Sequence, residues 1–159
     1  MNQKSPARII RTAGLLIVAY VVLAGTLCPK TKAYNAVLAC QFQLWQGETY
    51  IRPVSDHAAT LKLYTVSEDG QHVTSSTVFE ETGPTDANGY RNMSTRGFNI
   101  SLDAAGLFAT EKIRAEGIME YEGETYKGRQ DYLANVQEDP DLHEFNFAVK
   151  VDINAGNPE

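Results

Sequence analysis

The sequence is poor in the residues that most often carry catalysis, metal binding or covalent cross-links. Its 159 residues include only two cysteines and three histidines. There is no C-x-x-C pair, no H-x-H or H-E-x-x-H spacing, no glycine-rich phosphate loop and no G-x-S-x-G turn. We therefore expect no catalytic residue, no metal site and no cofactor, and we expect that the protein is not an enzyme.

Basic residues are also scarce outside the N-terminal part. Residues 1–33 hold five basic residues and no acidic one, so residues 34–159 hold nine basic and all 20 acidic residues, a net charge of −11. Such a charge repels nucleic-acid phosphates and anionic lipid headgroups. It argues against nucleic acid as a partner and favours a cationic one, although solubility alone is the commoner reason for this balance.

One hydrophobic run stands out, near the N-terminus. Lys4, Arg8 and Arg11 precede sixteen uncharged residues, and a proline follows. This layout is typical of a secretory signal peptide. The run is shorter than the roughly 20 residues that span a bilayer core, which favours cleavage, and an uncleaved membrane anchor over residues 12–28 is the alternative. We expect a secreted or extracytoplasmic protein, or a single-pass membrane protein with its C-terminal domain outside.

The cleavage site decides how many cysteines the exported chain keeps. Small residues at positions −3 and −1 precede two sites, after Ala24 and after Ala33. We prefer the second, so that residues 1–33 are the signal peptide or anchor and residues 34–159 are a single domain. Cys40 is then the only thiol, either packed in the core or linking two copies in a dimer. Cutting after Ala24 keeps both cysteines, which could close a small loop.

Alternation of apolar and polar residues dominates the rest of the chain and predicts β-strands. It recurs in 37–45, 59–66, 71–79, 96–103, 112–121 and 144–153. The inward faces of these runs carry Leu38, Cys40, Phe42, Leu44, Leu61, Leu63, Thr65, Val73, Ser75, Thr77, Phe79, Phe98, Ile100, Leu102, Ile113, Ala115, Gly117, Met119, Tyr121, Phe145, Phe147, Val149, Val151 and Ile153.

These runs predict an all-β fold, an antiparallel β-sandwich of about seven strands with an Ig-like or transthyretin-like Greek key. The N-terminal signal or anchor helix precedes it. The Asp69-Gly70 turn predicts a hairpin between 59–66 and 71–79. Asp103 predicts a cap for one short helix over 104–109. Long helices do not alternate with strands, so a parallel α/β sheet is not expected.

Two short segments carry a family resemblance. They are Leu61-Lys62-Leu63-Tyr64 and Thr85-Asp86-Ala87-Asn88-Gly89-Tyr90, each followed by an expected strand. With them, segment 58–102 resembles the transthyretin-like and carboxypeptidase-regulatory sandwich modules. The resemblance covers about a quarter of the chain and lacks the preceding Gly-x-Val strand. It supports the sandwich fold and implies no function.

Two turn motifs have both a functional and a structural interpretation. Asp86-x-Asn88-Gly89 resembles the start of a calcium loop, but the later carboxylates are missing, so we expect a β-turn. The tetrapeptide Gly-Glu-Thr-Tyr occurs at 47–50 and again at 123–126. Two hairpin turns explain this repeat better than a duplicated half-domain, which would be similar over 20 or more residues.

Aromatic residues are the best candidates for a binding surface. Trp45 and Tyr64 fall on the polar faces of their strands, and Tyr50 and Tyr126 close the two Gly-Glu-Thr-Tyr segments. Tyrosine and tryptophan are enriched at interfaces and bind sugars or proteins. We take these four residues as the expected binding site. Cross-strand aromatic pairs or a covering sheet would account for them equally well.

The leading functional hypothesis is an exported, non-catalytic β-sandwich that binds a protein or carbohydrate partner at or outside the cell surface. A membrane-anchored accessory subunit of an envelope assembly is a second hypothesis, with membrane contact only through residues 12–28. A secreted hydrolase that uses surface carboxylates is the third. The nearby acids do not form an obvious pair, because Glu80 and Glu81 would point to opposite faces of a strand, and Glu120, Glu122 and Glu124 are expected to be ordinary exposed charges at a turn.

Overall fold

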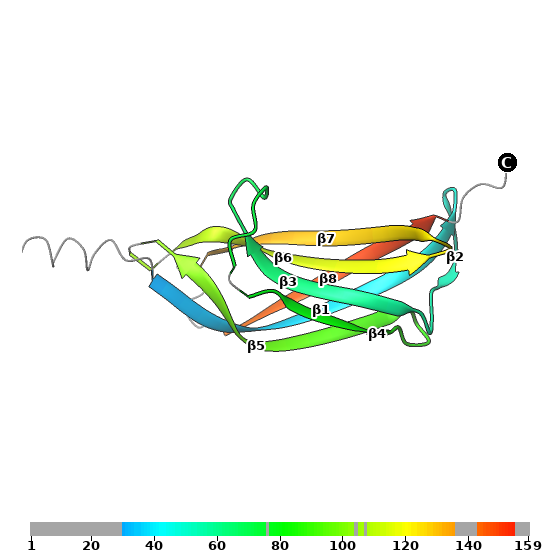
Figure 1. The fold of residues 1–159 in the computed structure, drawn as a ribbon, viewed down its shortest axis with the longest axis horizontal. Helices are drawn as coiled ribbons and strands as arrows, with labels where there is room; N and C mark the ends of the chain where they lie inside the picture. Colours follow the sequence, from blue (N-terminus) through cyan, green and yellow to red (C-terminus); the bar gives the residue numbers. More distant parts are fainter. Residues whose placement is uncertain (1–29, 76, 104, 107, 136–142, 155–159) are drawn as a thin grey trace, which may run out of the picture.

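The computed structural model describes residues 30–75, 77–103, 105–106, 108–135 and 143–154 (Figure 1). These residues form eight strands, β1 (Lys30–Gln46), β2 (Thr49–Pro53), β3 (Ala58–Val66), β4 (Phe79–Pro84), β5 (Tyr90–Leu102), β6 (Phe108–Tyr121), β7 (Glu124–Asn135) and β8 (Glu144–Asn154). The all-β prediction is confirmed, with eight strands where about seven were expected. Within these ranges there is no helix, and so none that could cross a membrane. The apolar segment 12–28 lies outside them.

Strand β1 organises half of the molecule. On one edge it pairs antiparallel with β5 over Lys30–Gln41 and then with β2 over Gln43–Gln46. On its other edge, Asn35–Trp45 pairs with β8 in parallel. The expectation of a purely antiparallel arrangement is therefore wrong for this pair. Alternation specifies which face of a strand is buried, but it does not specify the direction of the neighbouring strand.

The other strands form a second, antiparallel group in the order β4-β3-β6-β7. A single described bridge, Leu102 with Ala109, joins β5 of the first group to β6 of the second. In Figure 1, β3, β6 and β7 run side by side, and β1 and β8 cross behind them. The two groups are thus linked at one end of the molecule and pack together through side chains elsewhere.

The core is built from both groups, and the predicted faces supply most of it. The inward residues of β1, β3, β6 and β8 are buried, as are Phe98, Ile100 and Leu102 of β5. This agreement follows from the two-residue period of a strand, which places every second side chain on the same face.

A pair of glycines sets the closest approach between the groups. Gly117 of β6 and Gly128 of β7 are direct cross-strand partners. A Cβ added to Gly117 would lie 2.8 Å from the sulfur of Cys40, and one added to Gly128 would overlap the backbone oxygen of Lys150. Only residues without a side chain fit at these two positions, because β1 and β8 lie directly against them.

The predicted strand 71–79 is wrong over most of its length. Val73 makes only an isolated bridge with Val66, and it is 59% exposed. Regular pairing starts again at Phe79, the first residue of β4. The turn before this segment was predicted correctly, since Gly70 has a φ of +74° and donates its backbone N–H to the oxygen of Ser67.

The predicted short helix over 104–109 is also wrong where it can be assessed. Phe108 and Ala109 belong to β6, and Ala105 and Gly106 lie in a turn, while residues 104 and 107 lie outside the described ranges. Asp103 accepts a hydrogen bond from the backbone N–H of Phe108, and its own N–H donates to the oxygen of Phe108. The acidic residue therefore closes a connection between strands, a role that such a side chain performs as readily as capping a helix.

Both Gly-Glu-Thr-Tyr segments form two-residue hairpins, as expected. Gly47 is the first residue of the β1–β2 turn, with a φ of +60°. Gly123 is the second residue of the β6–β7 turn, with a φ of +85°, and Glu122 before it has a φ of +52°. The same four letters are therefore used in two different turn geometries, which argues against a duplicated half-domain.

Candidate functional site

Three of the four predicted aromatic residues lie at one end of the molecule. Trp45 at the end of β1 pairs with Tyr50 of β2, and their rings meet edge to face at 5.6 Å. The indole N–H of Trp45 donates to the carboxylate of Asp152 on β8 at 2.9 Å. Tyr50 is 45% exposed, and so is its neighbour Ile51. We call Trp45, Tyr50, Ile51 and Tyr126 the aromatic end.

Tyr126 is held at the aromatic end from β7. Its hydroxyl lies 2.9 Å from the backbone oxygen of Asn154 and 3.0 Å from the carboxylate of Glu124. Asn154 is in turn the parallel partner of Trp45. The end of β8 thus positions both aromatic side chains, Trp45 through Asp152 and Tyr126 through Asn154.

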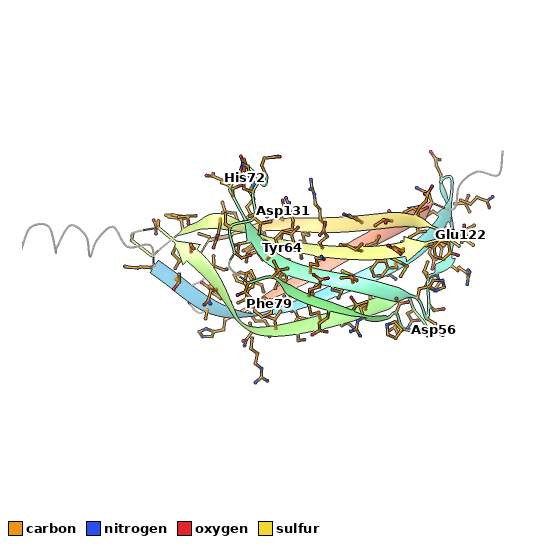
Figure 2. All side chains as sticks on the ribbon, in the orientation of Figure 1. Asp56, Tyr64, His72, Phe79, Glu122 and Asp131 are labelled. Carbon is orange, nitrogen blue, oxygen red and sulfur yellow. The ribbon has the colours of Figure 1, made fainter. Side chains whose placement is uncertain are left out.

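Tyr64 does not belong to this surface, and its predicted exposure is wrong. It is only 9% exposed, in the half of the molecule opposite the aromatic end, where Figure 2 shows it between Phe79 and Asp131. Its hydroxyl donates to Glu116 of β6 at 3.4 Å. Burial is the largest cause of the raised pKa of Tyr64, and the nearby Glu116 carboxylate raises it further. Alternation placed it on the outer face, but the adjacent β6 and its long side chains cover that face.

Sequence reasoning missed a polar recess at the end opposite the aromatic end. It is a partly open hollow of about 330 Å³ between the segment that precedes β4 and the C-terminal part of β5. Its walls include Asn99, the rings of Phe79 and Phe98, which lie 5.9 Å apart, and the side chain of Glu111. Hydroxyl groups dominate the remaining wall, supplied by Thr31, Thr65, Thr74, Ser75, Thr77 and Ser101. We call this cavity the hydroxyl recess.

Glu111 is the buried acid of the hydroxyl recess, with only 7% of its surface exposed. One carboxylate oxygen accepts the hydroxyl of Thr74 at 2.5 Å, and the other accepts the backbone N–H of Ser101 at 2.8 Å. The Thr74 hydroxyl also lies 2.8 Å from that of Thr65. The Thr74 hydroxyl carries one proton, so it donates either to the Glu111 carboxylate or to the Thr65 hydroxyl at any one time. Thr74 therefore lies between Thr65 of β3 and the buried carboxylate of Glu111.

The sequence contained a signal for this recess that was assigned to a strand. The run Thr74-Ser75-Ser76-Thr77 is rich in hydroxyls and lacks the apolar residues of a buried strand. Ser76 itself lies outside the described residues. Glu111 lies just before the predicted run 112–121, and extending the alternation of that run back from Ile113 by two residues places it on the inward face.

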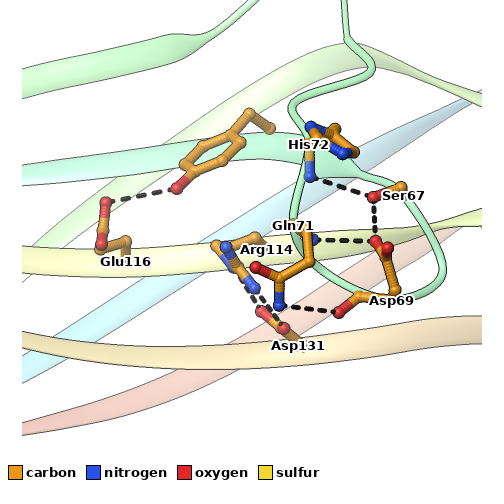
Figure 3. Close-up of polar contacts among 8 residues, drawn as sticks. Ser67, Asp69, Gln71, His72, Arg114, Glu116 and Asp131 are labelled. Carbon is orange, nitrogen blue, oxygen red and sulfur yellow. Dashed lines mark hydrogen bonds and ion pairs between the residues drawn. The ribbon is translucent and has the colours of Figure 1, made fainter.

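The loop between β3 and Val73 is held by its own polar contacts, shown in Figure 3. Ser67 donates to the carboxylate of Asp69 at 2.5 Å, and that carboxylate also accepts the backbone N–H of Gln71. The hydrogen bond from the Ser67 hydroxyl is the largest cause of the lowered pKa of Asp69, and that from the Gln71 N–H is the second.

An ion pair between two strands lies near this loop. Arg114 of β6 donates two hydrogen bonds of 2.7 Å to Asp131 of β7. These two bonds lower the pKa of Asp131.

The Asp86 turn is a structural feature, as expected. The carboxylate of Asp86 accepts the backbone N–H groups of Asn88 and Tyr90, both at 2.8 Å, and Gly89 has a φ of +75°. Across the part of the chain that the structure describes, no group of three or more His, Cys, Asp or Glu side chains is arranged to hold a metal ion.

The carboxylates considered for hydrolysis lie apart from the hydroxyl recess. Glu80 pairs with Lys62 at 3.0 Å and Glu81 with Arg91 at 3.6 Å. Glu120, Glu122 and Glu124 are exposed around the β6–β7 turn. Neither group is assembled with the buried Glu111.

Cys40 lies in the centre of the core and is fully buried. Burial raises its pKa to about 12, so the thiol stays protonated at neutral pH. A disulfide between two copies through Cys40 would require this core to open.

The chain has no match among family models and none among curated proteins. Among solved structures it is similar to an alternative pilotin from the type II secretion system of Vibrio cholerae. The sequence identity is 14% and the TM-score is 0.33, and the alignment covers 77% of this chain and 97% of that one. A likeness at this level assigns neither fold nor function.

Proposed function

We propose that this protein is an exported, non-catalytic β-sandwich that binds a protein partner through the aromatic end. The two strand groups form the layers of the sandwich, and the shared core between them provides a rigid scaffold. Binding residues on rigid strands and tight turns lose little conformational entropy when a partner binds.

The observation that carries the proposal is the fixed Trp45–Tyr50 pair, in which Trp45 is half-buried and Tyr50 is exposed. Its orientation is determined by strand pairing and by the hydrogen bond from Trp45 to Asp152. Exposed tyrosine and isoleucine beside a tethered tryptophan are the side chains that anchor protein interfaces. A protein suits this surface better than a carbohydrate, because the edge-to-face rings offer no flat platform and Ile51 adds aliphatic area. The acidic balance of the chain favours a cationic protein.

The protein acts outside the cytoplasm in this proposal, with the basic and apolar N-terminal segment as its export signal. A membrane-anchored accessory subunit is the second candidate, and the start of β1 favours it over secretion with cleavage after Ala33. Lys30–Ala33 already pair with Asn99–Leu102 of β5. Cleavage after Ala33 would remove these four residues from the sheet, whereas cleavage after Ala24 or retention of residues 12–28 as an anchor keeps β1 whole.

Site-specific photocrosslinking tests the aromatic end in cells that express the full-length protein. We would replace Tyr50 with benzoylphenylalanine and identify the adduct by mass spectrometry. The control position is Tyr132 on β7, which is 41% exposed and lies toward the other end of the strand. We expect one discrete protein adduct from position 50, lost when Trp45 is changed to alanine. Equal crosslinking from both positions would contradict the proposal.

Fractionation separates the two candidates. Intact mass of the protein from soluble and membrane fractions shows whether residues 12–28 are retained. A full-length species confined to the membrane fraction supports the anchored subunit. A soluble species that begins at Tyr34 supports simple secretion with cleavage after Ala33.

A further inference from the structure

We propose that the hydroxyl recess is a binding site for a small, neutral, polyhydroxylated ligand of monosaccharide size. The site lies at the opposite end from the aromatic end, so this inference goes beyond the proposed function and is tested separately. The evidence for this inference is the set of groups that line the recess and the edge of β5 beside it, where no described strand pairs at Asn99.

The volume of the recess limits the ligand. About 330 Å³ is near the lower end of the range of ligand pockets, roughly 300 to 1,000 Å³. A single sugar ring fits such a space, whereas a peptide of several residues does not.

The walls of the recess offer donors and acceptors in the mixture that a polyol needs. Within the described part of the chain, the side chains of Thr77 and Asn99 form no hydrogen bond. Ser75 accepts the backbone N–H of Thr65 at 3.2 Å, which leaves its own hydroxyl proton available to a ligand. None of the described residues that line the recess is basic, so an anionic ligand would find no counter-charge there.

The edge of β5 adds backbone groups to the recess. The N–H of Ser101 donates to Glu111, and its oxygen accepts the hydroxyl of Thr110, so both groups point away from β1. In an antiparallel strand, the backbone groups of residues two positions apart point in the same direction. The N–H and C=O of Asn99 therefore also point away from β1. No described strand pairs with β5 at Asn99, because the bridge to β6 is at Leu102. The edge therefore presents a free donor and a free acceptor next to Glu111.

Glu111 gives the site its chemical preference. Each of its carboxylate oxygens already accepts one hydrogen bond and retains a second lone pair. Two neighbouring hydroxyls of a sugar can donate to the two oxygens together, and hydrogen bonds to an ionised group are stronger than neutral ones. The half-buried ring of Phe79 provides an apolar wall for the C–H face of the ring.

An NMR titration of the full-length protein tests this inference. The probes are glucose, galactose, mannose, fucose and N-acetylglucosamine, each up to about 100 mM, since a lone sugar binds in the millimolar range. We expect at least one sugar to shift the amide signals of Thr74, Ser75, Asn99 and Ser101, with no shift at Tyr50. Tetramethylammonium serves as a cationic probe of the same buried carboxylate.

The matched variants are Glu111→Gln and Glu116→Gln. Both remove one charge from β6, but Glu116 does not line the recess. We expect Glu111→Gln to weaken sugar binding by about tenfold, the usual effect of losing a hydrogen bond to a charged group. We expect Glu116→Gln to leave it unchanged.

Three results would overturn the inference. The first is that no sugar shifts the signals of the recess, and the second is that only tetramethylammonium does. The third is equal sugar affinity in Glu111→Gln and wild type, provided that the spectra show both to be folded, because Glu111 would then only tie the loop to the sheet.

Discussion

The two halves of this molecule close in different ways. In the closed half, from the Gly117–Gly128 pair to the aromatic end, strands lie so near each other that a side chain would not fit between them. Here β1 and β2 and also β6 and β7 join through two-residue turns, and β8 runs alongside β1 up to Trp45. In the open half, from the hydroxyl recess to the loop after β3, β5 and β6 share a single bridge.

The two halves differ in the contacts that join their strands, because the open half has little strand pairing between β5 and β6. The open half uses side chains where the closed half uses backbone, since Glu111 connects Thr74 of the loop with Ser101 of β5. A backbone ladder leaves no room for a ligand, whereas a side-chain network around a cavity does. The comparison predicts tight packing in one half and exchangeable polar contacts in the other.

The largest effect is expected from Gly128→Ala in the closed half. The new methyl group would be forced onto the backbone of Lys150, which cannot move as a flexible side chain can. We expect the free energy of unfolding to fall by about 3 kcal/mol, at the upper end for overpacking. Urea unfolding followed by the fluorescence of Trp45, the only tryptophan, measures this.

The control for that variant is Gly123→Ala. A Cβ at Gly123 meets nothing within 4 Å, and only its φ of +85° opposes the change. We expect a loss of about 1 kcal/mol there, from backbone strain alone. If both variants lost the same free energy of unfolding, close packing at Gly128 would cost no more than the turn conformation at Gly123.

Glu111→Ala is the corresponding change in the open half. It removes the acceptor for Thr74 and for the partly buried N–H of Ser101, and we expect a loss of about 2 kcal/mol. Glu111→Gln keeps one oxygen, which can accept the N–H of Ser101, and its NH2 group can donate to the hydroxyl of Thr74, so it should lose less than half as much. If the alanine variant were as stable as wild type, Glu111 would not hold the open half together.

Trp45→Phe examines how firmly the aromatic end is held. It retains a ring against Tyr50 and removes the hydrogen bond to Asp152. We expect a loss of about 1 kcal/mol, typical of one hydrogen bond. Thermal unfolding by circular dichroism measures it, with Asp152→Asn as the partner variant, whose amide oxygen can still accept the indole N–H.

The smallest effect is expected from Asp131→Asn, beside the open half. Arg114 lowers the pKa of Asp131 below its value in the unfolded chain, so this ion pair stabilises the fold above the unfolded pKa, near 4. The stability it adds is lost as the pH falls through the lower, folded pKa. The pair is partly exposed, so we expect no more than about 1 kcal/mol at neutral pH.

A pH series of urea unfolding curves tests the sign of that effect. Wild type and Asp131→Asn should differ at pH 7 and converge as the pH falls well below 4. A difference that grows in acid would contradict the assignment.

Much of the fold could be predicted from particular residues. The alternation in β8 placed its five large apolar side chains in the core, and that in β1 placed Cys40 there. Segment 71–79 failed because residues 74–77 all carry hydroxyls, so Val73 is the only apolar residue on the predicted inward face before Phe79. The helix over 104–109 failed because Asp103 closes a connection between strands instead.

The candidate sites were predictable only in part. Trp45, Tyr50 and Tyr126 were found from residue type and turn position, but nothing in the sequence shows that β8 brings them to one end. Tyr64 was misplaced because the neighbouring strand covers its outer face. Glu111 was missed because its burial depends on a loop about 37 residues earlier in the chain.

The sequence by itself determined which side chains of β1, β3, β6 and β8 point inward and where the Gly-Glu-Thr-Tyr, Asp69-Gly70 and Asp86 turns fall. Both are local properties, set by the two-residue period of a strand and by glycines that accept a positive φ. Only the tertiary structure decided the parallel pairing of β1 with β8, the need for glycine at 117 and 128, and the cavity at Glu111. These features depend on the direction and distance of neighbours remote in the chain, and local preferences carry no information about either.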